Sequence, residues 1–170
     1  MVKPSDLVVI VTLTAGVAAA AAIDLRTRRV PNALTALLAI SGLGYAAFGI
    51  GHLTVAAALV GFFVGLVLML PGHLLGATGA GDVKLFAAMG ALLGPAPIVG
   101  AFLYTALAGG ALAAFVAFRR RRLHRTLGQA ARLVTTRGAA AAEIERPDEN
   151  NRFPYAPAIA VGSILAAIRL

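Results

Sequence analysis

Residues 85–118 read LFAAMGALLGPAPIVGAFLYTALAGGALAAFVAF, thirty-four consecutive residues without a charged side chain. A single helix of this length would measure about 51 Å, whereas the hydrocarbon core of a bilayer is only about 30 Å thick. The run therefore has to turn. Gly94-Pro95-Ala96-Pro97 lies inside it, and prolines interrupt helices. The sequence predicts a short helix that begins near Asp82 and a second helix at about residues 98–118.

The composition extends this apolar character to the whole chain of 170 residues. Hydrophobic residues make up 59% of it and charged residues 13%, and the mean hydropathy is +0.86. An average soluble domain carries about 25% charged residues. We therefore expect an integral membrane protein that forms a single domain over residues 1–170. Because cysteine is absent, disulfides, thiolate metal sites and cysteine nucleophiles are excluded.

Four further apolar stretches complete the predicted fold. They cover residues 7–23, 33–50, 53–70 and 153–168. The first three are near the lower length limit for a helix that crosses a bilayer. The sequence thus predicts an all-α fold, a polytopic membrane helix bundle with about six transmembrane helices. A polar segment at about residues 119–152 precedes the last of them.

The net charge of +8 is concentrated beside the apolar stretches. Three arginines lie within residues 26–29 and five more within residues 119–125. This distribution fits the positive-inside rule better than a nucleic-acid-binding face, so we expect membrane lipid and no nucleic acid as a partner. With six crossings, both arginine clusters and the connection at residues 71–81 are predicted to lie on the cytoplasmic side.

Two of the seven acidic residues lie at this predicted cytoplasmic boundary. Asp24 follows the first apolar stretch, and Asp82 ends the run Gly79-Ala80-Gly81-Asp82. An ionisable side chain at a membrane boundary costs free energy and indicates a function. Two aspartates that share a proton can hydrolyse a peptide bond, one as base and the other as acid. Gly79 and Gly81 would leave room for a substrate backbone beside Asp82.

Each acid also has an interpretation that needs no catalysis. Asp82 follows a glycine-rich turn and could cap the helix that begins there. Asp24 could balance the charge of Arg26, or that of Arg28 four residues further on.

Three more residues adjoin the acids and are candidates for shaping the site. Pro31 and Asn32 are predicted to start the second helix, since proline suits a first helical turn. Lys84 lies two residues after Asp82, so the two side chains do not face each other along a helix. We predict that Lys84 is an interfacial anchor, with binding of a substrate carboxylate as the alternative. His73 alone near the site is poor evidence for a metal, and neither a metal nor a cofactor is expected.

Three segments resemble conserved blocks of the type IV prepilin peptidases, a family of GxGD membrane aspartyl peptidases. Residues 24–32, an Asp followed by basic residues and Val-Pro-Asn, are similar to the first block. Residues 79–85, GAGDVKL, are similar to the second. Residues 153–160, FPYAPAIA, look like the start of the family's last helix. Other intramembrane aspartyl proteases share GxGD, but the three blocks in this order are more specific.

This resemblance implies that Asp24 and Asp82 are catalytic acids. The enzyme would remove a short basic leader from pilin-like precursors at the cytoplasmic face of the bacterial inner membrane. By the same resemblance, we expect neither the extra N-terminal domain nor the cysteine-rich loop of the large members, which also N-methylate their product. The chain is more similar to the short, peptidase-only members that serve Flp-type tight-adherence pili.

Two other functions fit the same residues. A small transporter or channel subunit could use Asp24 and Asp82 for the passage of protons or cations. A non-catalytic assembly protein of a pilus or secretion complex is the other alternative. Ion pathways place acids near mid-depth in the membrane, so the boundary position of both acids favours the peptidase. The sequence leaves the oligomeric state open.

Overall fold

The computed structural model of the protein describes residues 4–119 and 155–168, without the side chains of residues 116–119. The described residues form six helices and no strand, which confirms the predicted all-α bundle. The helices are α1 (Pro4–Thr27), α2 (Asn32–Ala47), α3 (Val55–Leu74), α4 (Ala80–Leu93), α5 (Pro95–Arg119) and α7 (Ala156–Ala167). Beyond Arg119, the polar segment predicted at about residues 119–152 lies outside the described residues.

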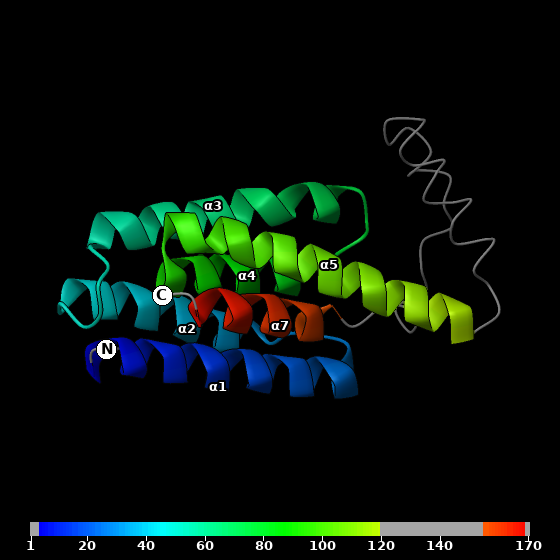
Figure 1. Cartoon of the computed structure of the whole chain (residues 1–170), viewed down its shortest axis with the longest axis horizontal. Coiled ribbons are helices and arrows are strands. Elements are labelled where there is room, and N and C mark those ends of the chain that lie inside the picture. The colour runs from blue at the N-terminus through cyan, green and yellow to red at the C-terminus, as the bar shows by residue number, and fades with distance from the viewer. Residues whose placement is uncertain (1–3, 120–154, 169–170) are drawn as a thin grey trace.

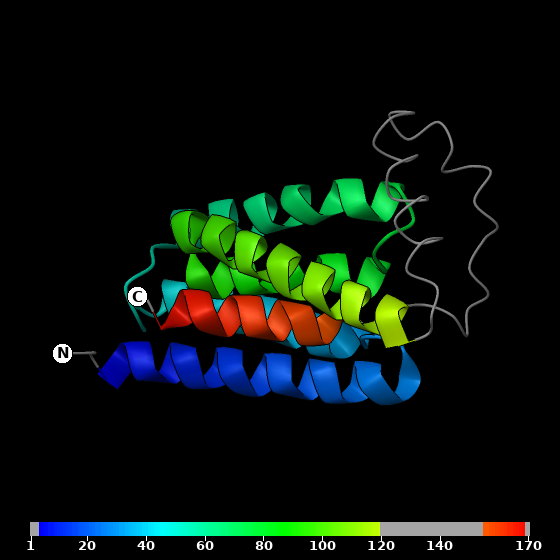
Figure 2. The same cartoon turned by 45° about the vertical axis from the view of Figure 1, so that its right-hand side comes forward.

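From α1 to α5, each helix runs antiparallel to the next (Figure 1). Five helix ends gather at the right-hand end of the bundle in both Figure 1 and Figure 2. They are the ends of α1 and α3 and the starts of α2, α4 and α7. We call this the acid end, because α1 carries Asp24 in its last turn and α4 carries Asp82 in its first. Because of the order of the helices, Asp24 and Asp82 lie at the same end of the bundle, as predicted.

Helix α4 forms the centre of the bundle. Eleven of its 14 residues are buried, and it contacts every other described helix. Glycines allow two backbones to approach closely: a Cβ atom on Gly90 would collide with the carbonyl oxygen of Gly61 in α3. A helix of 14 residues measures only about 21 Å, less than the thickness of a hydrocarbon core. Surrounding protein, rather than lipid, therefore covers this short helix.

Among the described residues, three helices are long and apolar enough to cross a membrane, namely α1, α3 and α5. The shorter apolar helices α2 and α7 have 16 and 12 residues. Large apolar side chains point outward, as for Phe63 in α3 and Leu107 in α5, which are 59% and 72% exposed. Such an outer surface is suited to lipid, in agreement with a helical membrane bundle.

Three predicted helix ends were wrong by about one turn. Helix α2 ends at Ala47, earlier than the predicted residue 50. Helix α1 continues past residue 23 to Thr27, so Asp24 lies inside the helix and not after it. Helix α3 continues through Pro71 to Leu74. The proline removes one N–H donor close to the end of the helix, and helices in membranes tolerate such an interruption. The Gly-rich connection to α4 is therefore shorter than residues 71–81.

The turn within residues 85–118 is confirmed but is tighter than predicted. Only Gly94 separates α4 from α5, with a φ of 85°, a left-handed conformation that favours glycine. Pro95 begins α5, because a first helical position does not need the N–H that proline lacks. Helix α7 begins at Ala156, whereas the last span was predicted from residue 153.

Candidate active site

Two segments of the predicted site contact each other at the acid end. A Cβ atom on Gly81 would lie 3.1 Å from both the Cβ and the carbonyl oxygen of Val30, which precedes α2. One turn further along α4, the Lys84 Nζ donates a hydrogen bond to Asn32 Oδ1 at 3.0 Å. These contacts join residues 24–32 to residues 79–85.

Asp24 lies in the last turn of α1 and is only 5% exposed. Its Oδ2 accepts a hydrogen bond of 3.1 Å from the backbone N–H of Ala156, the first residue of α7. An N–H group at a helix start has no partner inside its own helix, and the dipole of the helix favours a negative charge there. The third sequence block therefore reaches the site through the start of α7.

Asp82 is the third residue of α4 and is 7% exposed. Its Oδ2 accepts a hydrogen bond of 3.0 Å from the N–H of Gly79, and its own N–H donates to the Gly79 carbonyl at 3.1 Å. The carboxylate thus folds back on the first turn and stabilises it. The capping interpretation is correct in effect, although Gly79 occupies the cap position. A Cβ atom on Gly79 would lie 3.2 Å from the Asp82 carboxylate.

Tyr155 lies just before α7. Its neighbour in the chain donates a hydrogen bond to Asp24, and its own hydroxyl is influenced by the charge of Asp82. Burial raises the pKa of the Tyr155 phenol, and the negative charge of Asp82 raises it further. The next residue, Ala156, is the hydrogen-bond donor to Asp24. The start of α7 therefore contacts Asp24 directly, and Tyr155 lies within electrostatic range of Asp82. From the sequence, no role was assigned to Tyr155; its place beside the proline-rich start of the last helix was the available signal.

Pro31 and Asn32 begin the second helix as predicted. Pro31 has extended backbone angles, and its carbonyl accepts the first hydrogen bonds of α2, which starts at Asn32. The contact between Lys84 and Asn32 was not foreseen, because 52 positions separate the two residues. Lys84 is exposed, as an interfacial anchor would be, but its amine is directed to α2.

A groove opens beside this contact, between α2 and α3 and over α4. Its volume is about 260 Å³. Its lining is apolar except near the Asn32–Lys84 contact and comprises Asn32, Thr35, Ala36, Ala39, Phe62, Leu66, Lys84 and Ala87.

The connection from α3 to α4 is held by His73. Its Nδ1 donates a hydrogen bond of 3.0 Å to the carbonyl of Thr78, the residue before Gly79. Gly76 makes the turn with a φ of 73°. His73 therefore supports the chain that leads to Asp82. Within residues 4–119 and 155–168, no three potential ligand side chains gather into a metal site.

Comparison with known families assigns the chain. Residues 11–114 match the type IV leader peptidase family. The protein belongs to this family. The match includes Asp24, Asp82 and the segments that contact each other at the acid end, but it stops before α7. No match was found among curated proteins or among solved structures.

Membership of the leader peptidase family confirms the resemblance noted in the sequence and makes the protein a peptidase. The two candidate site segments inside the matched region carry Asp24 of α1 and Asp82 of α4, and α7 adds a backbone donor from outside the matched region. The bundle thus brings together candidate site residues that lie far apart in the sequence.

Proposed function

We propose that the protein is a membrane aspartyl endopeptidase that removes the leader from type IV prepilin-like precursors of the Flp type. One observation carries the proposal. Asp24 and Asp82, which are 82 − 24 = 58 positions apart, are both buried at the acid end, where residues 24–32 and 79–85 contact each other. Family membership supports the reaction class, and this arrangement supports Asp24 and Asp82 as its acids.

The reaction needs one carboxylate ionised and the other protonated. The ionised carboxylate takes a proton from water as the water oxygen attacks the carbonyl carbon of the scissile peptide bond. The protonated carboxyl donates its proton to the carbonyl oxygen, which gives a neutral tetrahedral diol. The C–N bond then breaks, the leaving nitrogen receives a proton, and the diol returns one to the pair. Two close carboxylates resist double ionisation, so the titration belongs to the pair.

The position of the acids favours peptidase chemistry over ion passage. Transporters bind ions near the middle of the bilayer, at broken helices. Asp24 and Asp82 instead lie at one end of the bundle, in the last turn of α1 and the first turn of α4. Arg26 and Arg29 are exposed at the same end, which supports a cytoplasmic active site by the positive-inside rule.

The two glycines before Asp82 support approach by an extended substrate chain. Gly79 and Gly81 are both partly exposed, so their backbones are accessible beside a buried carboxylate. A side chain on Gly79 would crowd Asp82, and one on Gly81 would press on Val30. Small residues at these positions keep the space next to the acid open.

Substitution of each acid tests the proposal. We expect Asp24→Asn and Asp82→Asn each to lower cleavage of a pilin precursor by at least about 10³-fold, because amides cannot exchange the proton. The double variant is expected to be no worse than either single variant, since the pair acts as a unit. Asp6→Asn, at the opposite end of α1, is the matched control and should cleave normally.

The measurement is a precursor-shift assay in membranes that contain equal amounts of each variant. Appreciable cleavage by Asp24→Asn or Asp82→Asn would exclude the two-acid mechanism. Inactive but correctly inserted wild-type protein would favour the alternative of a non-catalytic assembly protein.

A further inference from the structure

The ring of Tyr155 lies in a notch on α5 that only glycine can form. A Cβ atom on the buried Gly109 would lie 2.7 Å from Cε2 of Tyr155 and 3.0 Å from its Cζ and Oη atoms. Carbon atoms do not approach to 2.7 Å without displacement, so any side chain at this position would push the ring away. The next residue, Gly110, is exposed, and a Cβ atom there would meet nothing within 4 Å.

The backbone of the same tyrosine begins α7. The Tyr155 carbonyl accepts hydrogen bonds from the N–H groups of Ala158 and Ile159, at 3.0 and 3.2 Å. Pro157 has no N–H group to offer. The remaining donor in this first turn is the N–H of Ala156, which is directed to the Asp24 carboxylate. Tyr155 and Ala156 are adjacent in the chain. A shift of the Tyr155 ring and backbone would therefore also move the start of α7 and the N–H group that binds Asp24.

Asp24 depends on this hydrogen bond because of its burial. Ala156 is fully buried and Asp24 nearly so. A buried carboxylate that loses its hydrogen-bond donor costs free energy, which favours its movement away from that position. We propose that Tyr155 is a positioning residue for Asp24, which acts through the notch at Gly109 and the N–H of Ala156. The effect on cleavage rests on the proposed peptidase function, whereas the hydrogen bond itself can be measured without it.

The first test measures amide exchange and needs no substrate. In the full-length protein, Gly109→Ala should accelerate hydrogen exchange of the Ala156 amide by about threefold to tenfold, the worth of one hydrogen bond. Asp24→Leu, which removes the acceptor, should accelerate it similarly. Gly110→Ala is the matched control and should leave it unchanged. Equal exchange in Gly109→Ala and Gly110→Ala would overturn the proposal.

The second test separates positioning from general destabilisation. Gly109→Ala should lower kcat for precursor cleavage by about tenfold, since small displacements of a catalytic group have such effects, while KM stays within about twofold. Gly110→Ala should change neither constant. In a Tyr155→Ala background, Gly109→Ala should cause no further loss, because both changes act through the same ring.

The conservative variant Tyr155→Phe keeps the ring in the notch and should recover most of the kcat that Tyr155→Ala loses. Additive losses in the double variant, or a Tyr155→Phe variant as impaired as Tyr155→Ala, would each overturn the proposal. If wild-type protein cleaves no precursor, the peptidase proposal fails, and the exchange measurement alone still decides the role of Tyr155.

Discussion

At the acid end, Asp24 and Asp82 are nearly inaccessible and accept hydrogen bonds from backbone N–H groups at the starts of helices, whereas at the opposite end Asp6 lies beside a histidine. The Asp6 Oδ1 atom is 3.5 Å from His52 Nδ1, and the two side chains are 22% and 43% exposed. Both ends thus combine a carboxylate with an apolar helix terminus, but the carboxylates of the acid end are much less exposed.

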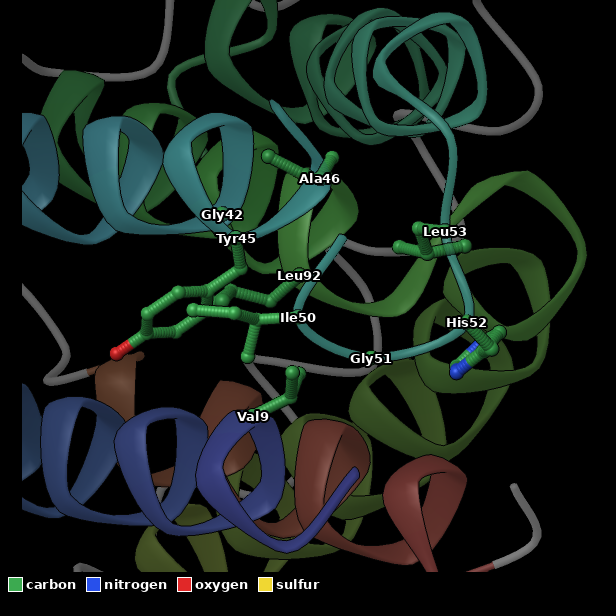
Figure 3. A pocket seen from close by; sticks show the side chains of 10 residues that line it. Val9, Gly42, Tyr45, Ala46, Ile50, Gly51, His52, Leu53 and Leu92 are labelled. Carbon is green, nitrogen blue, oxygen red and sulfur yellow. The ribbon is translucent and has the colours of Figure 1, made fainter. Parts of the chain in front are cut away.

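Apolar side chains and turns close the opposite end. Figure 3 shows Val9 of α1 and Ile50 of the connection from α2 to α3 pointing toward each other across a small hollow. Beside it, the hydroxyl of Tyr45 forms a hydrogen bond of 2.9 Å with that of Thr12. Gly51 makes the turn with a φ of 92°. These contacts fasten two helices and a loop together.

A boundary position does not by itself make a carboxylate a candidate for catalysis. Asp6 and Asp24 flank the same apolar stretch: Asp6 precedes it and Asp24 follows it. Burial and backbone donors distinguish the two, since they keep a carboxylate in place inside a poorly solvated site. Asp6 instead has a partly exposed histidine as its neighbour.

The largest effect is expected in an experiment on membrane sidedness. We expect the acid end and the opposite end to face different compartments. Leu74→Cys, at the acid end, and Phe48→Cys, at the opposite end, are both well exposed positions in a chain without native cysteine. In intact cells, an impermeant thiol reagent should label Phe48→Cys and leave Leu74→Cys unlabelled until the cells are opened. Labelling of Leu74→Cys from outside would place the acids on the outer face.

A smaller but still large effect is expected for Gly81→Val. The new side chain would press on Val30, separate the segments that carry the two acids and reduce cleavage by about 10- to 100-fold. Gly44→Val in α2 is the control, because a Cβ atom there meets nothing within 4 Å. Cleavage is compared at equal amounts of inserted protein. Gly90 would be a poor control, since a side chain there collides with the backbone of α3. Equal activity of Gly81→Val and Gly44→Val would show that the Gly81–Val30 contact is unimportant.

The smallest effect is expected for Lys84→Gln, which weakens the hydrogen bond to Asn32 at the acid end. Because this bond is exposed, its loss should reduce the cleavage rate only by about twofold to fivefold. His52→Gln changes a similarly exposed polar contact at the opposite end and should leave the rate unchanged. The two variants are compared by initial rates on one precursor. A larger loss in His52→Gln would mean that the two ends are coupled.

The order and approximate length of the helices were available from the sequence, as was the GxGD run that begins α4. Inside a membrane every backbone group needs a partner within its own segment, so an apolar run without charges specifies a helix locally. The turn at Gly94 and the helix start after Pro31 are likewise local, because they depend on backbone angles that glycine and proline prefer.

Only the tertiary structure decided what surrounds the acids. The hydrogen bond from Ala156 to Asp24 joins residues 132 positions apart, and neither residue type predicts it. The central place of α4 also depends on backbones that approach at glycines, and the notch at Gly109 depends on the ring of Tyr155 packing against that residue. In an almost uniformly apolar chain, hydropathy cannot distinguish a face toward lipid from a face toward protein. The fit of side chains against distant backbones makes that distinction, and it exists only once the helices have packed.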